Sequence, residues 1–193
     1  MNRKLTVVQV LPSLISGGVE KGTLEVAKYI ASKGHKSIVI SGGGRLVEQL
    51  EYDGSEHIKW DIGKKSLITF FYVFKLIRLI KRNRIDIIHA RSRLPAWIIF
   101  LALKFINKHK RPHFITTVHG FNSVSFYSSI MTKGEKVIAV SKVIEKFIIK
   151  HYKINSSKII LNYRGVDSNE FNLNDLVNEE WINSWKKEFP LLN

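Results

Sequence analysis

The chain has 193 residues, with 31 Lys and Arg against 16 Asp and Glu and a net charge of +15 at neutral pH. This length allows one sizeable domain with a hydrophobic core, and the absence of Cys excludes disulfides and Cys-based metal sites. The charge favours partners such as nucleic acid, anionic lipid or a phosphorylated substrate. An AT-rich genome, which increases Lys, Ile and Asn, would explain the charge equally well.

Short apolar runs alternate with amphipathic segments along the chain. The first run, in "MNRKLTVVQVLP", is interpreted as a strand and not as a signal peptide, because it is short and no small-residue cleavage site follows. Strands are predicted over residues 5–11, 37–41, 57–62, 85–91, 113–120 and 136–141, and a strand with a turn over 158–167. Helices are predicted over residues 18–33, 45–52, 67–82, 94–108, 142–151 and 175–189.

This alternation predicts the fold class. Continuous apolar strands are typical of parallel sheets that are buried on both faces, so we expect a single Rossmann-like, doubly wound parallel α/β sheet. Ligands bind such sheets at the carboxyl ends of the strands. The segments that follow the predicted strands are polar, Gly-rich or His-containing, which predicts a ligand-binding crevice there: 13–18, 41–44, 89–93, 119–122, 141–142 and 164–167.

A glycine pair, Gly17 and Gly18, separates the first predicted strand from the first predicted helix. Glycine lets a ligand approach the backbone closely, and the start of a helix favours an anion such as a diphosphate. The pair is neither a G-x-G-x-x-G fingerprint nor a Walker loop. A tight turn that needs glycine for its own geometry is an equally good interpretation.

Several motifs together resemble one enzyme family. The stretch "LPSLISGGVEKGTLEVAKYIASKGHKSIVIS" resembles the start of retaining glycosyltransferases of the large GT-B family 4. The resemblance continues in the family's order through "IDIIHARSRLPAW", "TTVHGF", "EKVIAVSKVIEKFI" and "KIILNYRGVDSNEF", and covers the chain to about Phe171. The pattern is most similar to lipopolysaccharide or capsule sugar transferases.

The resemblance implies a domain organisation. Family members have an N-terminal domain that mainly binds the acceptor and a C-terminal domain that binds most of the nucleotide sugar. This chain matches the N-terminal half. We therefore expect a GT-B N-terminal domain over residues 1–171 and a helical tail or linker over residues 172–193, toward a second domain that the sequence lacks.

The resemblance also implies roles for individual residues. His119 matches the histidine that contacts the transferring sugar and is the catalytic candidate, with Gly120 beside it as a substrate-binding residue. Gly17 and Gly18 would face the donor diphosphate, and Arg164 the donor phosphates.

The stretch after the fourth predicted strand offers an acceptor site. His89 and Arg91, with Arg93 nearby, would hold an acidic or phosphorylated acceptor. Alternatives from the residues themselves are a capping or core-edge role for His119 and a solvated surface position for either arginine.

Other polar residues have simpler interpretations. Ser141 is expected to cap the next helix and Asp167 to stabilise a local turn. Apart from His109 and His113, the seven His show no H-x3-H spacing, and the sequence has no D-x-D run, so we expect no metal site and no cofactor. The resemblance implies a nucleotide sugar as co-substrate. The candidate loops also lack a glycosidase-like carboxylate pair. The resemblance to retaining GT-B enzymes implies that this domain acts by positioning and electrostatics.

Residues 64–84, "KKSLITFFYVFKLIRLIKRNR", form a basic and apolar segment that is too short and too charged to span a bilayer. Lys75, Arg78 and Arg82 recur at helical spacing, and Phe70, Phe71, Phe74 and Ile77 are expected to lie away from them. We expect the apolar side to cover the sheet, with the basic side in water or against an anionic membrane.

The expected function is retaining, metal-independent transfer of a sugar from a nucleotide-sugar donor to a cell-envelope polysaccharide or lipid-linked acceptor, with a separate C-terminal domain. The expected location is the cytoplasm, peripherally on the inner face of the cytoplasmic membrane. One alternative is a truncated, non-catalytic remnant that acts as a basic acceptor- or membrane-binding module. Another is a nucleic-acid-binding protein, on charge alone; no RRM, helix-turn-helix or zinc-finger signature supports it, and no specific nucleic-acid partner is expected.

Overall fold

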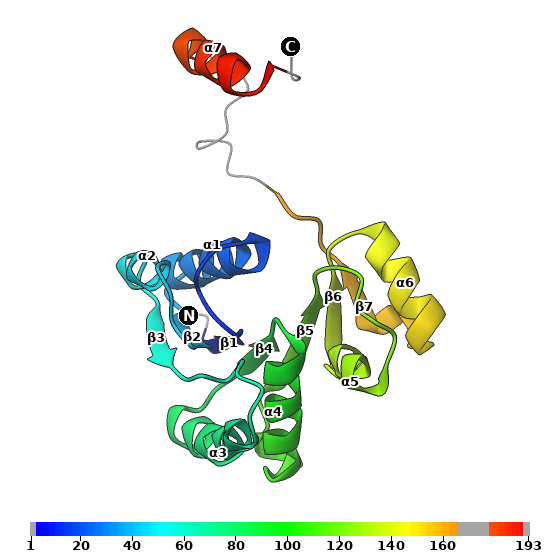
Figure 1. Ribbon diagram of the computed structural model, residues 1–193. Coiled ribbons are helices and arrows are strands. Elements are labelled where there is room, and N and C mark those ends of the chain that lie inside the picture. The colour runs from blue at the N-terminus through cyan, green and yellow to red at the C-terminus, as the bar shows by residue number, and fades with distance from the viewer. Residues whose placement is uncertain (1–2, 166–177, 191–193) are drawn as a thin grey trace. The chain divides into compact units, whose positions relative to one another are not determined.

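The computed structural model describes residues 3–165 and 178–190. The chain divides into two compact units, Met1–Tyr163 and Arg164–Asn193. The first unit contains a seven-stranded sheet in the order β3-β2-β1-β4-β5-β6-β7, in which every neighbouring pair is parallel, with helices on both faces (Figure 1). This architecture confirms the predicted Rossmann-like, doubly wound α/β sheet.

All seven predicted strands form. Their bounds are β1 (Thr6–Val10), β2 (Lys36–Ser41), β3 (Glu56–Lys59), β4 (Ile87–Ala90), β5 (His113–Val118), β6 (Lys136–Ala139) and β7 (Ile159–Leu161). The strand order reverses direction between β1 and β4. Such a switch point is where doubly wound sheets bind their ligands, so the carboxyl ends of β1 and β4 set the place of the site.

The predicted helices of the first unit also form: α1 (Gly18–Ser32), α2 (Val47–Tyr52), α3 (Phe71–Asn83), α4 (Arg93–Lys104) and α6 (Lys142–Tyr152). The helix predicted over 67–82 is divided, because residues Leu67–Phe70 form a 3₁₀ turn, η1, before α3 begins. The prediction missed the short elements, which lack a full amphipathic period: α5 (Phe126–Ser129), η2 (Lys108–Lys110), η3 (Ile130–Thr132) and η4 (Ser156–Lys158).

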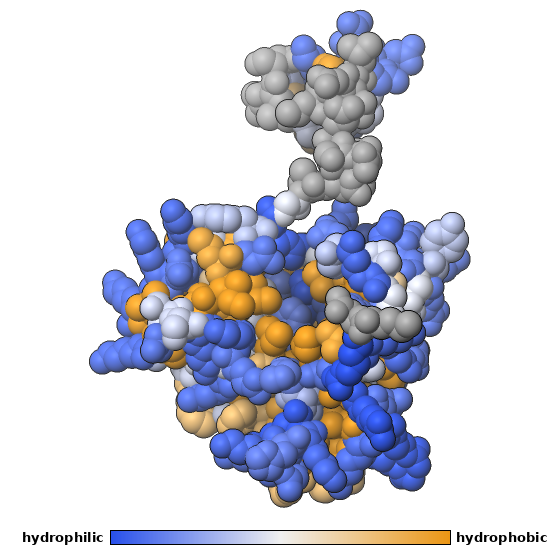
Figure 2. Space-filling view, turned by 180° about the vertical axis from the view of Figure 1, so that it is seen from behind, coloured by the Kyte–Doolittle hydropathy of each residue, from blue (hydrophilic) through white to orange (hydrophobic). Residues whose placement is uncertain are grey.

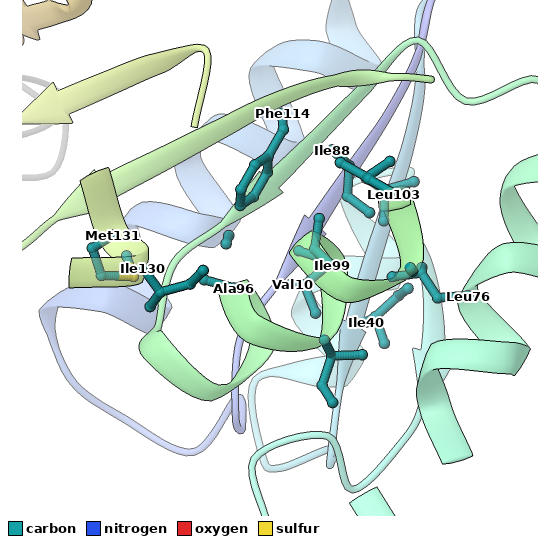
Figure 3. Close-up of a cluster of buried hydrophobic side chains, with 14 of the residues drawn as sticks. Val10, Ile40, Leu76, Ile88, Ala96, Ile99, Leu103, Phe114, Ile130 and Met131 are labelled. Atoms are coloured by element: carbon teal, nitrogen blue, oxygen red, sulfur yellow. The ribbon is translucent and has the colours of Figure 1, made fainter. Parts of the chain in front are cut away.

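The core has two layers, one on each face of the sheet. Figure 3 shows the larger one, in which Val10, Ile40 and Ile88 of the strands meet Ile99 of α4 and Leu76 of α3. A smaller cluster, which includes Val39 and the buried Ala27 of α1, lies on the other face. Successive strand residues point to opposite faces, so β2 supplies Ile40 to the larger layer and Val39 to the smaller one.

One prediction for α3 is wrong. Phe70, Phe71 and Phe74 are exposed at 46%, 66% and 68%, although they were expected to cover the sheet. The side of α3 that packs on the core is instead Val73, Leu76 and Ile80, which are spaced by three and four residues. A helix can turn only one such stripe inward, and Phe71 and Phe74 lie on the opposite side.

The second unit contains α7 (Glu179–Glu188), which falls inside the helix predicted over 175–189. Its start is capped by the Asn178 side chain, which accepts hydrogen bonds from the backbone N–H groups of Glu180 at 2.8 Å and Trp181 at 3.2 Å. The boundary predicted between residues 171 and 172 lies outside the described residues and stays a prediction.

The surface of the first unit is largely hydrophilic. Seen from behind, hydrophilic side chains ring the first unit and hydrophobic ones gather toward the middle of this face (Figure 2). Among the helices that the structure describes, none is both long and apolar enough to cross a membrane.

Candidate functional site

The glycine pair lies where α1 begins. Gly17 has φ 121°, a backbone angle that other residues rarely adopt, and a Cβ at this position would be 2.8 Å from Oε2 of Glu20. A Cβ on Gly18 would have no heavy atom within 4 Å. The local turn therefore explains Gly17 but does not require Gly18, whose side faces open space at the start of the helix.

The glycines after β2 hold the β1–α1 turn in place. The Gly42 N–H donates to the Pro12 carbonyl at 2.9 Å, and the Leu14 N–H donates to the Gly43 carbonyl at 2.9 Å. Gly44 has φ 145°, and a Cβ there would lie 2.4 Å from the Leu14 carbonyl oxygen. This loop thus packs its backbone against the turn that carries Gly17, a structural reason for the glycines of the predicted 41–44 segment.

A row of buried polar side chains crosses the middle of the sheet on the face covered by α1. Gln9 of β1 lies in register with His89 of β4. Its amide donates to the Thr23 carbonyl of α1 at 3.1 Å, and its Oε1 accepts from Nη1 of Arg91 at 2.9 Å. The exposure of Gln9, His89 and Arg91 is 1%, 8% and 5%. The solvated-surface alternative is therefore wrong for Arg91.

The row extends to β5, where Nε2 of His89 lies 2.7 Å from Oγ1 of the buried Thr117. The pKa of His89 is lowered to about 3, chiefly by burial and in addition by the nearby Arg91 and His119. The imidazole is therefore neutral at neutral pH, while the Arg91 guanidinium keeps its charge. The site holds one fixed positive charge beside a neutral hydrogen-bonding ring.

His119 follows β5 directly and is half-buried. It lies two residues after Thr117, just beyond the end of β5, and it is close enough to affect the pKa of His89. A Cβ on the adjacent Gly120 would have no heavy atom within 4 Å. The structure thus brings His89, Arg91 and His119 together at the carboxyl edge, beside an open stretch of backbone.

Two neighbouring residues have structural roles. Arg93 donates from Nη1 to Oγ of Ser128 at 3.1 Å and lies over the Tyr127 ring, with 5.3 Å from its guanidinium carbon to the ring centroid. It therefore joins α4 to α5 and is not simply a solvated side chain. Ser141 caps α6, since its Oγ accepts from the Ile144 N–H at 3.2 Å, and the predicted capping role is confirmed.

The remaining predicted residues, Arg164 and Asp167, are not part of the first unit. Arg164 is exposed and belongs to the second unit, so its approach to the donor phosphates stays a prediction. Asp167 lies outside the described residues. In residues 3–165 and 178–190, no group of three or more His, Asp or Glu side chains is arranged to hold a metal ion.

Sequence reasoning missed Gln9 and Thr117. Each is a polar residue inside an otherwise apolar strand, in "TVVQV" and "HFITTV". A polar group that is buried in a sheet needs a hydrogen-bond partner. A single Gln within the first strand was therefore a usable signal that a polar partner, here Arg91, approaches that strand.

A cavity of about 980 Å³ lies at the opposite edge of the sheet, where β1, β4 and β5 begin. Apolar side chains line it together with five cationic residues, Arg3, Lys81, Arg84, Lys110 and Arg111. Since the ligands of doubly wound sheets bind at the carboxyl edge, this cavity is separate from the site described above.

Comparison with known proteins decides the family. Residues 16–170 match the family model of Glycosyltransferase Family 4. The chain belongs to this family. This match confirms the resemblance to family 4 that the sequence motifs indicated. No curated protein sequence matches it significantly.

Solved structures extend the comparison. A glycosyltransferase from Rickettsia africae ESF-5 is 39% identical, with a TM-score of 0.78; the alignment covers 97% of this chain and 50% of that one. HepE from Anabaena, solved in complex with UDP-glucose, is 15% identical over 98% of this chain and 50% of its own, with a TM-score of 0.72.

The lipopolysaccharide outer core galactosyltransferase WaaB is 14% identical over 84% of this chain and 46% of its own, with a TM-score of 0.63. The two more distant structures support the fold. The family 4 chain spans about half the length of these proteins, which agrees with a match to one GT-B domain.

Proposed function

We propose that this chain is the acceptor-side domain of a retaining, metal-independent glycosyltransferase. It would act with a donor-side domain and transfer a sugar from a nucleotide-sugar donor to a cell-envelope polysaccharide or lipid-linked acceptor. The observation that carries the proposal is the group formed by His89, Arg91 and His119 at the carboxyl edge, on the face where α1 begins. HepE, which was solved with UDP-glucose, and WaaB, a galactosyltransferase, support this reaction class.

In this proposal the residues act by positioning and electrostatics. His119 would hydrogen-bond hydroxyls of the transferring sugar, with Gly120 leaving room for it. Gly17 and Gly18 would admit the donor diphosphate at the start of α1. Arg91 would contribute a fixed positive charge to an acidic or phosphorylated group, and the neutral His89 would hold the shape of the site through Thr117. Arg164 would approach the donor phosphates.

Ligand-observed NMR tests the proposal. We expect saturation transfer from the purified chain to at least one of a set of UDP-, GDP- and ADP-sugars. The signal should be lost in Gly18→Val and in His119→Ala, and should persist in the control His109→Ala, which alters an exposed histidine on η2. Circular dichroism confirms that each variant is folded. A folded chain that binds no nucleotide sugar would contradict a donor site in this domain.

A second candidate function is a non-catalytic acceptor- or membrane-binding module. The net charge of +15 favours it, because a basic surface attracts anionic glycans and lipids without any donor. Binding to anionic vesicles or anionic polysaccharide, with no saturation transfer to any nucleotide sugar, would support this module over the enzyme.

The proposed location is the cytoplasm, peripherally on the inner face of the cytoplasmic membrane. There the chain would have access both to nucleotide sugars and to lipid-linked acceptors.

A further inference from the structure

Large apolar side chains are exposed where η1 passes into α3. Leu67, Ile68, Phe71 and Phe74 have exposures of 86%, 71%, 66% and 68%. We name these four residues, together with Lys75 and Arg78, the η1–α3 surface. Single exposed apolar residues are ordinary on protein surfaces, but several within eight consecutive positions indicate an interaction site.

The geometry of α3 places aromatic and basic groups on one stripe. Phe71 precedes Lys75 by four residues and Arg78 by seven, and Phe74 precedes Arg78 by four; these are the spacings of neighbours on one side of a helix. The core-facing side of α3 is elsewhere, so all four side chains point away from the sheet. Lys75 is held close to the helix, with its Nζ 5.2 Å from the centroid of the Tyr72 ring.

The segment that carries this surface has charge of a single sign, and the exposed Asp61 directly precedes it. Residues 62–85 contain no Asp or Glu. The helix that packs beside α3 is α4, and its sequence, RLPAWIIFLALK, contains no acidic residue either. The basic residues of the 62–85 segment are Lys64, Lys65, Lys75, Arg78, Lys81, Arg82 and Arg84.

The η1–α3 surface lies toward the edge of the sheet that carries the candidate site. The Tyr72 hydroxyl accepts from the N–H of Asp61, which follows the carboxyl end of β3. A Cβ on Gly63 would lie 2.5 Å from Cβ of Pro12, which follows β1. The start of α3 is therefore tied to the carboxyl ends of β1 and β3, and its far end leads back to the start of β4 at the opposite edge.

We propose that the η1–α3 surface docks on an anionic phospholipid membrane. Leu67, Ile68, Phe71 and Phe74 enter the boundary between headgroups and acyl chains, while Lys75 and Arg78 bind headgroup phosphates. A second copy of the chain fits this surface poorly, because pairing it with itself would bring like charges together. An acidic protein would pair with the cations, but acidic groups would not explain the four exposed apolar side chains on η1 and α3.

The biological meaning of this docking rests on the proposed function. A lipid-linked acceptor is presented at the membrane surface. A contact made by the start of α3 holds the carboxyl edge of the sheet, with His89, Arg91 and His119, near that surface. The docking itself depends only on the exposure and charge of the η1–α3 surface.

Vesicle flotation tests the proposal with the full chain. We expect the chain to bind vesicles of phosphatidylcholine that contain about 30% phosphatidylglycerol. Its partition coefficient for pure phosphatidylcholine should be at least tenfold lower, because such binding depends on anionic lipid. Phe71→Ser/Phe74→Ser and Lys75→Gln/Arg78→Gln should each lower the partition coefficient at least tenfold. All four side chains are exposed, so circular dichroism should show intact folding.

Matched controls separate docking from general attraction. Phe105→Ser removes an aromatic side chain that is 70% exposed at the end of α4, and Lys146→Gln/Lys150→Gln removes two exposed cations from α6. Both should bind vesicles like the wild type. Absence of vesicle binding, or an equal loss in the controls, would overturn the proposal, as would dissociation of a dimer by Phe71→Ser/Phe74→Ser in size-exclusion chromatography.

The same variants keep this inference separate from the proposed function. Saturation transfer to nucleotide sugars should be unchanged in Phe71→Ser/Phe74→Ser, because neither residue belongs to the candidate site. Vesicle binding without any donor binding would leave the docking surface standing and contradict the enzyme. Donor binding without vesicle binding would support the enzyme and contradict the docking surface.

Discussion

Replacing His89 with Gln should flatten the dependence of stability on pH. The pKa of His89 is lowered from the ordinary value of 6.5 to about 3, chiefly by burial. Between these two values the unfolded chain binds a proton at this histidine and the folded chain does not. The free energy of unfolding must therefore fall as the pH decreases through this window.

The size of the effect follows from the two pKa values. Each pH unit within the window changes the free energy of unfolding by about 1.4 kcal/mol. Between pH 7 and pH 5 the His89 contribution amounts to about 2 kcal/mol, because the unfolded histidine starts to bind protons only near pH 6.5. Gln preserves a neutral hydrogen-bonding side chain next to Thr117 but cannot take up this proton.

Urea denaturation at pH 7 and pH 5 measures the effect. The loss of stability between the two conditions should be about 2 kcal/mol smaller in His89→Gln than in the wild type. Part of the dependence remains, since burial also lowers the pKa of His57. The control His109→Gln, at an exposed position, should behave like the wild type. An identical pH dependence in His89→Gln would refute a buried, neutral His89.

Four further substitutions test the local structure by chemical denaturation at pH 7. Gly17→Ala should lower the free energy of unfolding by about 1 to 3 kcal/mol, because Gly17 has a positive φ. Gly18→Ala should change it by less than about 0.5 kcal/mol, because the added Cβ meets no neighbouring atom. Equal losses would show that the two glycines serve the same turn. Gln9→Leu should cost about 3 kcal/mol, because the buried Arg91 loses the acceptor of its Nη1, and an unchanged stability would argue against this hydrogen bond. Gly44→Ala should cost about 3 kcal/mol or more, since its Cβ would overlap a backbone carbonyl, and a fully stable variant would contradict the close approach of the two loops.

The strand pattern was readable from sequence because it depends on local composition. Short apolar runs, and the alternating stretch over 57–62, predicted all seven strands, and their alternation with helices predicted the parallel sheet. Family motifs pointed to His119 and to the glycine pair at strand ends, positions that follow from chain order alone.

The environment of individual side chains was harder to predict, because it depends on which strands become neighbours. Arg91 looks like a surface residue in "IIHARSR", yet it is buried because β4 lies beside β1 and Gln9 accepts its hydrogen bond. Phe71 and Phe74 look like core residues, yet only one stripe of α3 can face the sheet, and Val73, Leu76 and Ile80 occupy it. In both cases a long-range contact decided the outcome.

Protein-observed NMR with UDP-glucose would test the central claim, a nucleotide-sugar site at the carboxyl edge, most directly. In an isotope-labelled chain, titration should shift the resonances of Gly18, His119 and Gly120. The resonances of Arg84 and Lys110, which line the basic cavity at the opposite edge, should stay in place. Shifts confined to that cavity, or none at saturating concentrations of UDP-, GDP- and ADP-sugars, would contradict the account.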